Sequence, residues 1–225
     1  MKIFIPTRGR PFDQVTLSFF PEELKKQVVL VIDKDEEDKY KFYHDDQAKM
    51  IVPEDCIGIG PKRKYIVDNT DDPHIVMLDD DLRFYIRKSP TDWHLRYLEK
   101  EEYPAMFGLL EEWMKQGYAH CGISAREGNN RVEDLSVENT RYMRVLAYNL
   151  DAFPDNIEWG RTKIMEDFDM SLQLLKSGKP CKVSYYYAQG QKSSNAKGGC
   201  SEWRTIDVHN EGAQLLADLH PTCVK

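Results

Sequence analysis

Two short apolar runs rich in branched side chains constrain the fold of this sequence most, because acidic residues follow each of them at once. Residues 28–32 read VVLVI and lead into Asp33, and residues 74–78 read HIVML and lead into Asp79. Such runs are typical of strands that are buried on both faces, as the strands of parallel sheets are. Residues 2–6 form a third, shorter run of this kind.

Helical patterns lie between the predicted strands. Residues 13–26 suit a helix that breaks at Pro21, and residues 62–69 suit a short helix with Pro61 at its first turn. Residues 34–46 are highly charged and suit a solvated helix, and residues 50–53 suit another strand. The first 81 residues therefore alternate strand and helix, which predicts an α/β fold whose central sheet is mostly parallel. Sheets of this class bind ligands at the carboxyl ends of their strands.

The rest of the chain is less regular. Residues 97–116, 167–176 and 207–219 suit helices, the first of them interrupted near Pro104. Residues 118–124, 141–150 and 183–187 suit strands, and the polar residues 125–139 and 189–199 suit loops. Since there is neither an internal repeat nor a linker rich in proline and serine, we expect one domain over residues 1–225.

The charge balance narrows the classes of function. Lysine and arginine number 31 and aspartate and glutamate 38, so the net charge of −7 argues against a protein that coats nucleic acid with its whole surface. No apolar run approaches the roughly 20 residues of a membrane span, so no membrane segment is expected. The five cysteines are widely spaced without a CxxC pair, which favours reduced thiols in the cytoplasm over a zinc or redox site.

Three adjacent aspartates, Asp79, Asp80 and Asp81, follow the run at residues 74–78. Neighbouring carboxylates repel one another unless a cation lies among them. Their hard oxygen atoms suit Mg²⁺ or Mn²⁺ that bridges a diphosphate. The alternative is a solvated acidic turn or a helix cap, which needs no ligand.

Other polar residues lie at the ends of the remaining predicted strands or at the turn before the 74–78 strand, and would share the same edge of a parallel sheet. They are Thr7, Arg8, Gly9, Arg10, Asp33, Gly60, Lys62 and Arg63. Together they would supply cations for phosphate groups and an acid for a nucleotide base or ribose. The pattern is neither a P-loop nor a GxGxxG dinucleotide site, because both glycine patterns are incomplete.

The order of these motifs resembles the nucleotide-sugar half of a GT-A glycosyltransferase, with IPTRGR, VIDKDE, GIGPKRKYIVDN and VMLDDDL in succession. The segment from Met165 to Asp167 resembles the acidic element that supplies the catalytic base in inverting members. This resemblance extends over residues 2–178. Within the superfamily, the chain is similar to the TET-associated glycosyltransferases of phages, which act on 5-hydroxymethylcytosine in DNA. That similarity lies in the compact size and in the IPTRGR, GPKRKYI and KGGCSEWR segments.

The resemblance implies a single GT-A-like, Rossmann-like domain with a role for each of these residues. Residues 1–81 would form the half that binds the nucleotide sugar, and residues 82–225 the half that binds the acceptor. The implied donor-binding residues are Thr7, Arg8, Asp33, Gly60, Lys62, Arg63, Asp79 and Asp80. Asp81 and Asp79 would bind Mn²⁺ or Mg²⁺, with His209 as a later ligand. Asp167, or else Glu166, would be the general base.

The implied reaction is the metal-dependent, inverting transfer of a sugar from a UDP-sugar to a hydroxyl group of 5-hydroxymethylcytosine in DNA. Such an enzyme would act in the cytoplasm, that of the host if a phage encodes it, and no protein partner is expected. Residues 189–204 would be a mobile segment, either a lid over the diphosphate or a surface loop.

Basic and aromatic side chains after residue 81 would line a groove for the DNA. The basic residues are Arg83, Arg87, Lys88, Arg126, Arg131, Arg141 and Arg144, and the aromatic ones are Phe84, Tyr85, Trp93 and Trp159. Phosphates would bind the first set, and an extruded base would stack on the second. The alternative is that these are solvated faces and core aromatics.

Other functions remain open at this point. GT-A glycosyltransferases also act on glycans, lipid-linked sugars and proteins, and such acceptors predict binding that depends little on salt. Sugar nucleotidyltransferases use a similar sheet and release pyrophosphate. A module that binds a nucleotide sugar or DNA without catalysis would need no general base such as Asp167.

Overall fold

The computed structural model describes residues 1–191 and 205–224. Its strands are β1 (Lys2–Pro6), β2 (Val28–Asp33), β3 (Ala48–Val52), β4 (His74–Leu78), β5 (Leu82–Ser89), β6 (Asp92–Tyr97), β7 (His120–Ala125), β8 (Ser136–Glu138), β9 (Val145–Asn149) and β10 (Cys181–Gln191). Its α-helices are α1 (Val15–Ser18), α2 (Glu22–Lys25), α3 (Glu37–Tyr43), α4 (Ile59–Asp68), α5 (Tyr103–Lys115), α6 (Glu166–Lys176) and α7 (Ile206–Leu219). Short 3₁₀ helices are η1 (Lys34–Glu36), η2 (Lys100–Glu102), η3 (Asn129–Arg131) and η4 (Leu150–Ala152).

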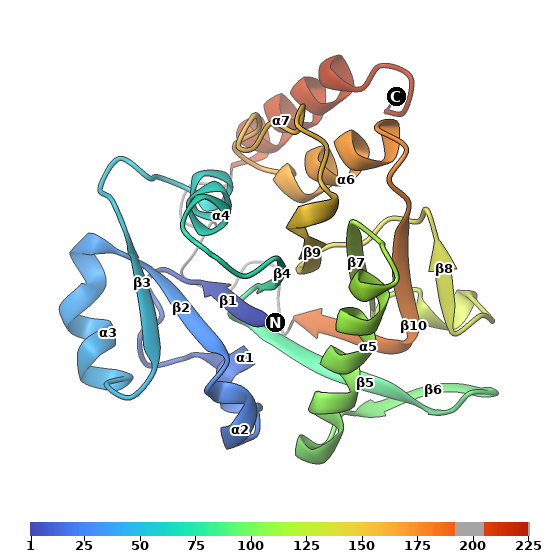
Figure 1. The fold of residues 1–225 in the computed structure, drawn as a ribbon, viewed down its shortest axis with the longest axis horizontal. Coiled ribbons are helices and arrows are strands. Elements are labelled where there is room, and N and C mark those ends of the chain that lie inside the picture. The colour runs from blue at the N-terminus through green and yellow to red at the C-terminus, as the bar shows by residue number, and fades with distance from the viewer. Residues whose placement is uncertain (192–204, 225) are drawn as a thin grey trace.

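All ten strands join one sheet in the order β3-β2-β1-β4-β9-β7-β10-β5-β6, with β8 paired to β10 outside this path (Figure 1). β1 lies parallel to β2 and β4, and β2 lies parallel to β3. The ends of β1, β2 and β4 therefore share one edge of the sheet, the carboxyl edge, where Thr7, Asp33 and Asp79 lie. The α/β fold with mostly parallel central strands is thus confirmed.

The second half of the sheet is mixed. β9 runs antiparallel to both β4 and β7, and β10 runs parallel to β7 but antiparallel to β5. Because β9 bonds to β4 on one side and to β7 on the other, one continuous sheet joins the two halves of the chain. Residues 125–139, predicted to be a loop, contain η3 and the short strand β8, which pairs with β10.

A β-hairpin formed by β5 and β6 lies where no strand was predicted. The predicted helix from residue 97 starts too early, since residues 92–97 belong to β6 and α5 begins at Tyr103. A capping box between Glu99 and Glu102 precedes α5, and Pro104 lies in the first turn instead of interrupting the helix. The sequence signal for the hairpin is weak because β6 is largely exposed and lacks a regular apolar alternation.

Two apolar cores hold helices against the two faces of the sheet. Val76 and Leu78 of β4 belong to one core, and the alternating residues Ile75 and Met77 belong to the other. The first core includes the helical residues Leu17, Leu24, Tyr103, Met106, Phe107 and Leu110. The second includes Ile66 of α4 with Met170 and Leu174 of α6. Helices thus cover both faces, and no helix among the described residues is long and apolar enough to cross a membrane.

Two other segments differ in part from the expectations. β10 extends to Gln191, so residues 189–191 of the predicted mobile segment belong to a regular strand, while residues 192–204 lie outside the described part of the chain. The segment 34–46 contains η1 and α3, which end at Tyr43 and expose most of their side chains as predicted. Glu36 and Tyr40, however, are buried. This helix is therefore attached to the sheet through one face.

Helix α7 packs through Gly212 against the segment that precedes α6. A methyl group added at Gly212 would lie 2.5 Å from Cγ1 of Ile164, whereas nothing lies within 4 Å of one added at Gly108 in α5. Alanine favours a helix over glycine by about 1 kcal/mol, so Gly108→Ala should raise the free energy of unfolding. Gly212→Ala should lower it by about 1–3 kcal/mol, because the contact has to open. Urea unfolding of both variants tests this packing, and shifts of the same sign would contradict it.

Candidate active site

Thr7 connects the ends of β1 and β4 at the carboxyl edge. Its hydroxyl donates to Asp80 Oδ2 at 2.6 Å, accepts from Gln14 Nε2 at 2.8 Å and lies 2.8 Å from the hydroxyl of Tyr40. All four side chains are buried. Burial raises the pKa of Asp80, and the charge of Arg10 and the Thr7 hydrogen bond oppose that shift. Asp80 therefore points into the protein and joins the strand ends.

Arg10 lies between the second and third aspartates. Its guanidinium is 2.6 Å from Asp80 Oδ1 and 3.1 Å from Asp81 Oδ2. Burial acts against its charge, but the two carboxylates prevail and raise the pKa of Arg10. Arg10 thus supplies part of the positive charge that a row of carboxylates needs.

A buried ion pair lies at the ends of β1 and β2. Lys62 Nζ, from the first turn of α4, is 2.7 Å from Asp33 Oδ2 and donates to the carbonyl of Thr7 at 3.1 Å. Arg8 lies 2.7 Å from the same Asp33 oxygen. The side chains of Lys62 and Asp33 are buried, whereas that of Arg8 is 47% exposed and also pairs with Asp35. Arg8 therefore presents its charge toward solvent.

Arg63 joins the aspartates to the start of α6. Its buried guanidinium pairs with Glu166 Oε1 and lies 3.3 Å from Asp79 Oδ1. The elements α4, β4 and α6 meet at this side chain, although Arg63 and Glu166 are 103 residues apart in sequence. Among the described residues, Arg63 Nε and the hydroxyl of Tyr148 are buried without a hydrogen-bond partner. Polar atoms at this site are thus left for a further partner.

Asp167 follows Glu166 in the first turn of α6 and has the chemistry of a proton acceptor. Burial, together with the charge of Glu166, raises the pKa of Asp167 to about 6 despite the opposing charge of Arg63. Oδ1 of Asp167 accepts a hydrogen bond from the backbone N–H of Phe168 at 2.9 Å. A carboxylate whose pKa lies near neutrality can take a proton from a reacting hydroxyl group.

Asp79 and Asp81 converge on one point at the end of β10. Gln191 Nε2 donates to Asp81 Oδ1 at 2.7 Å and to Asp79 Oδ2 at 3.4 Å. Burial raises the pKa of Asp79 to about 7, with Arg63 opposing the shift and Asp81 adding to it. Two oxygens so placed suit two coordination positions of a hard divalent cation. His209 lies exposed on α7, and residues 1–191 and 205–224 hold no cluster of three potential metal ligands.

Two residues with a left-handed backbone flank the site. Met165 (φ 60°) precedes α6, and Arg144 (φ 67°) precedes β9. Such a conformation costs a non-glycine residue about 1–3 kcal/mol and is concentrated at functional sites. Gly60, which was predicted to bind the donor, allows close packing, because a methyl group there would lie 3.3 Å from the carbonyl oxygen of Thr162. Its small size lets α4 approach the segment that precedes α6.

A second buried acid anchors α6 against the last part of the chain. Asp169 Oδ1 lies 2.7 Å from His220 Nε2 and pairs with the guanidinium of Arg161. Gln173, one turn further along α6, donates to Asp169 Oδ2 at 3.1 Å. Because Asp169 is close to Asp167 on the same helix, this cluster fixes the helix end that carries the acid pair.

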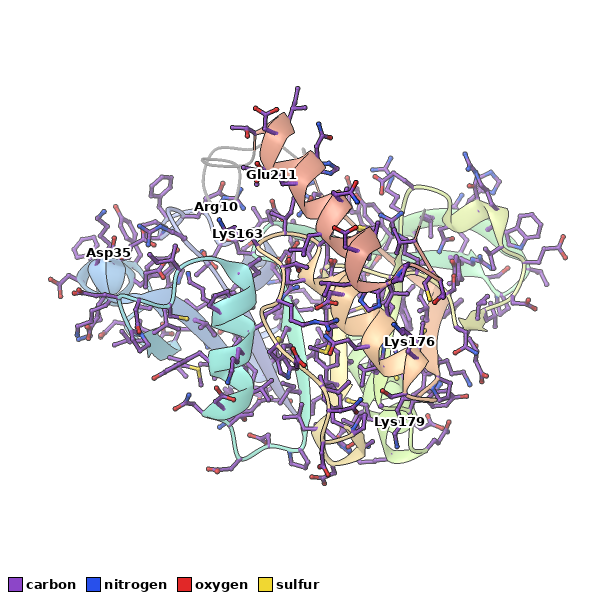
Figure 2. All side chains as sticks on the ribbon, turned by 90° about the horizontal axis from the view of Figure 1, so that it is seen from above. Arg10, Asp35, Lys163, Lys176, Lys179 and Glu211 are labelled. Carbon is purple, nitrogen blue, oxygen red and sulfur yellow. The ribbon has the colours of Figure 1, made fainter. Side chains whose placement is uncertain are left out.

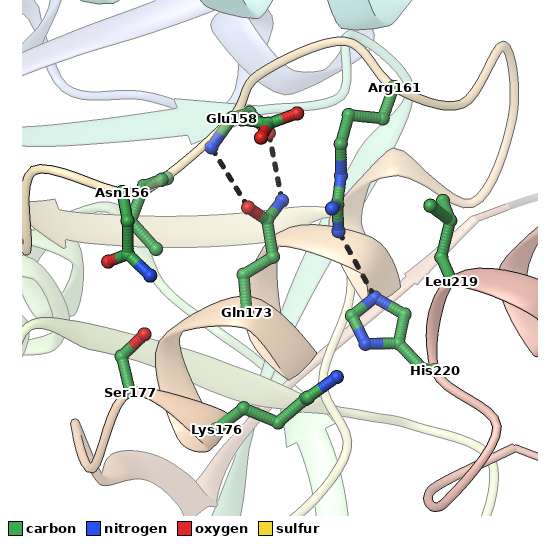
Figure 3. A pocket seen from close by; sticks show the side chains of 9 residues that line it. Asn156, Glu158, Arg161, Gln173, Lys176, Ser177, Leu219 and His220 are labelled. Carbon is green, nitrogen blue, oxygen red and sulfur yellow. Dashed lines mark hydrogen bonds between the residues drawn. The ribbon is translucent and has the colours of Figure 1, made fainter.

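A pocket of about 420 Å³ lies beside this cluster, and Arg161, Lys176 and His220 are among its lining residues (Figure 3). Lys176 is the last residue of α6, whereas Asp167 lies in the first turn of that helix. In Figure 2, Lys176 also lies well away from Arg10. The pocket is therefore separate from the carboxyl edge.

Most of the predicted site residues gather at the carboxyl edge. They are Thr7, Arg8, Asp33, Lys62, Arg63, Asp79, Asp80, Asp81, Glu166 and Asp167. His209 does not join Asp79 and Asp81 in a cluster of three potential metal ligands within the described part of the chain. Arg10 was expected at this edge as part of the IPTRGR motif but without a role of its own, whereas sequence reasoning missed Tyr40 and Gln191, for which no local pattern gave a signal. The catalytic and binding roles of all these residues stay predictions.

The mixed sheet with its parallel first half and its polar carboxyl edge gives this chain a GT-A-like fold. The structure is similar to that of S. aureus TarS 1–349 in complex with UDP-GlcNAc, with a TM-score of 0.59 and 14% identity over 97% of this chain. The corresponding complex of TarS with UDP gives a TM-score of 0.51 and 15% identity. This chain spans 66% and 65% of the lengths of those two structures, slightly less than two thirds. At such identities the likeness shows the fold alone.

The chain belongs to the TET-associated glycosyltransferase family, whose model matches residues 1–199. Two phage relatives carry the name beta-glucosyl-HMC-alpha-glucosyl-transferase. The one from Enterobacteria phage T2 is 27% identical over 215 residues, which cover 89% of this chain and 74% of the relative. The one from Enterobacteria phage T6 is 26% identical over 231 residues, 96% of this chain and 80% of the relative. The family expected from the sequence is therefore confirmed, and the protein is a glycosyltransferase.

The anchoring of α6 can be tested by removing the buried charge of Asp169. Asp169→Asn should lower the free energy of unfolding by about 3 kcal/mol, because it leaves a partly buried cation without its partner. Asp68→Asn removes an exposed carboxylate that pairs with Lys64, and it should change the free energy of unfolding by less than about 1 kcal/mol. Equal losses in urea unfolding would show that the Asp169 cluster does not stabilise the fold.

Proposed function

We propose that the protein transfers a sugar from a UDP-sugar to a hydroxyl group on 5-hydroxymethylcytosine in DNA. The observation that carries this proposal is the contact of Arg63 with both Asp79 and Glu166, which brings the aspartate turn and the acid pair together. The names of the T2 and T6 relatives support an acceptor that contains HMC. Since both relatives come from phages, the proposed place of action is the cytoplasm of an infected host cell.

The donor would bind along the carboxyl edge. The exposed charge of Arg8 and the carboxylate of Asp33 suit the phosphate and the ribose or base of a nucleotide. Asp79 and Asp81 would hold Mn²⁺ or Mg²⁺, which neutralises the charge of a leaving diphosphate when it is bound. Arg63 keeps Asp79 in place before a donor arrives, so little rearrangement is needed.

Asp167 would take the proton of the acceptor hydroxyl. As the hydroxyl oxygen bonds to the anomeric carbon of the sugar, the bond from that carbon to the diphosphate breaks and the proton passes to the Asp167 carboxylate. Glu166 suits this task less because Arg63 holds it in an ion pair. A single displacement of this kind inverts the configuration at the anomeric carbon.

The names of the phage relatives favour a second acceptor of the same class, a glucose already attached to HMC, and an alpha product. From an alpha-linked donor, an alpha product means retention of configuration, which a single displacement does not give. The anomeric configuration of the new linkage, read by NMR from the isolated product, therefore tests the inverting mechanism separately from the acceptor. A beta linkage supports Asp167 as a base in a single displacement.

The acceptor can be identified by incubating the protein and UDP-glucose with duplexes that carry cytosine, 5-hydroxymethylcytosine or its beta-glucosyl derivative. Mass spectrometry of the digested nucleosides should show a hexose added to a modified base alone. Asp167→Asn should slow transfer by about 10²–10⁴-fold and preserve donor binding, since the amide keeps the shape but accepts no proton. Asp155→Asn, at an exposed position, is the matched control and should keep the rate.

The same assay gives the dependence of the rate on pH. The rate should fall as the pH drops below about 6, because the raised pKa of Asp167 leaves its carboxyl protonated there. No hexose on either modified duplex with several UDP-sugars would overturn the proposed acceptor. A rate that does not change across this pH range would count against Asp167 as the base.

The proposed metal dependence can be tested on donor binding alone. Calorimetry should show that Mn²⁺ strengthens the binding of UDP-glucose to the wild-type protein, because the cation bridges the diphosphate and the carboxylates. Asp81→Asn should remove most of this effect, and Asp71→Asn, at an exposed position before β4, should preserve it. Donor binding that is indifferent to both Mn²⁺ and the loss of Asp81 would contradict the mechanism.

A further inference from the structure

We propose that a platform of two tyrosines and two arginines on the β5–β6 hairpin and at the end of β7 binds the DNA strand that carries the acceptor base. The platform consists of Tyr85, Tyr97, Arg83 and Arg126. This inference rests on the proposed function, and it names the surface that would hold the nucleic acid. A base would stack on Tyr97, and the flanking phosphates would bind the two arginines.

The two tyrosines form a stacked cross-strand pair. Tyr85 of β5 lies opposite Tyr97 of β6, and their ring centroids are 4.9 Å apart with an angle of 28° between the ring planes. Tyr85 is 8% exposed and Tyr97 is 57% exposed. The inner ring thus supports the outer one, which is largely exposed to solvent. Nucleobases stack on aromatic side chains of this kind in single-stranded nucleic-acid sites.

The two arginines flank the stacked pair. The guanidinium of Arg126 lies 5.2 Å from the ring centre of Tyr85 and donates to its hydroxyl at 3.3 Å. The guanidinium of Arg83 lies 5.3 Å from the ring centre of Phe19 and 5.9 Å from that of Tyr97. Arg126 is exposed and Arg83 is partly exposed. Aromatic rings therefore hold both cations in place, and within residues 1–191 and 205–224 neither forms an ion pair with a carboxylate.

The platform adjoins the carboxyl edge through the backbone. β5 begins at Leu82, the residue after Asp81, and β10 pairs with it so that Gly190 opposes Arg83 and Gln191 opposes Leu82. Gln191 in turn contacts Asp81 at 2.7 Å. A strand held on the platform would therefore lie next to the point where Asp79 and Asp81 converge.

Arg126 reaches the same edge from the other side of β10. Its backbone N–H donates to the carbonyl of Gln189 at 2.7 Å, immediately beyond the end of β7. A methyl group added at Gly190 would lie 3.4 Å from side-chain atoms of both Arg126 and Tyr85. Both side chains therefore lie against the strand that ends at the proposed catalytic centre.

Burial removes several residues of the predicted groove from consideration. Arg87 is fully buried and donates to backbone carbonyls of residues 129, 132 and 133, so its charge serves the fold. Phe84 lies in the first apolar core, and Trp159 is stacked on Phe153. Arg83, Tyr85 and Arg126 belong to the predicted set and meet at one surface with Tyr97, which was not part of that set.

The chemistry of the platform matches a nucleic-acid strand better than a glycan. The protein as a whole carries a net charge of −7, so binding to DNA needs a local group of cations such as this one. A base inside a duplex cannot reach an enzyme's reacting atoms without leaving the stack. Stacking on Tyr97, beside the proposed catalytic centre, would compensate part of the free energy that a base loses when it leaves the stack of the duplex.

Binding of a fluorescent duplex containing 5-hydroxymethylcytosine, measured at several salt concentrations, tests the platform. Tyr97→Ala should weaken DNA binding by about 5- to 100-fold, and Tyr97→Phe should restore most of it because the ring is kept. Arg126→Ala should weaken binding and reduce the slope of log Kd against log salt concentration by about one. The affinity for UDP-glucose, measured by calorimetry, should stay unchanged in all three variants.

Two matched controls lie away from this surface. Tyr43 of α3 is 53% exposed, nearly as much as Tyr97, and Lys115 ends α5 next to the opposite end of β7. Tyr43→Ala and Lys115→Ala should bind DNA as the wild-type protein does. Unchanged DNA binding by Tyr97→Ala and Arg126→Ala, in a protein that still modifies DNA, would overturn the platform alone. A wild-type protein that neither binds nor modifies DNA would overturn the proposed function and the platform together.

Discussion

The rest of the site depends on the ion pairs that the buried guanidinium of Arg63 forms with Asp79 and Glu166. The guanidinium brings the carboxylates of Asp79 in the turn after β4 and of Glu166 in α6 to one side chain of α4. Moving a charge out of water costs several kcal/mol, and the cost is recovered only when its partners lie in contact. These three elements therefore cannot shift independently without leaving a charge unpaired. Electrostatic compensation holds the carboxyl edge in shape before any ligand binds.

The three consecutive aspartates take two different directions in the turn that joins β4 to β5. Asp80 turns inward toward Thr7, while Asp79 and Asp81 both reach Gln191. The middle carboxylate thus joins strands, and the outer two face the side on which a ligand can approach. A row of like charges is tolerated here because cations from α4 and from the segment after β1 lie among them.

Local sequence patterns predicted the first half of the fold because its strands are buried on both faces. β1 and β4 begin and end where their apolar runs do, and the polar residues at the strand ends gather as parallel strands require. The second half depends on contacts that no local pattern records, such as the antiparallel course of β9 and the exposed hairpin of β5 and β6. The site divides in the same way. Arg63 and Asp167 follow from motif order, whereas Tyr40 and Gln191 take their places from partners far away in sequence.

The hairpin of β5 and β6 ends the sheet, and in the described part of the chain no strand lies beyond β6. The sequence of an edge strand can change without altering the register of the strands inside the sheet. With the proposed platform, β6 and the outer side of β5 would set the preference for an acceptor, while the proposed donor site lies on the inner strands. Substitutions on β6 would then change the nucleic acid that is recognised without altering the strands that carry the donor site.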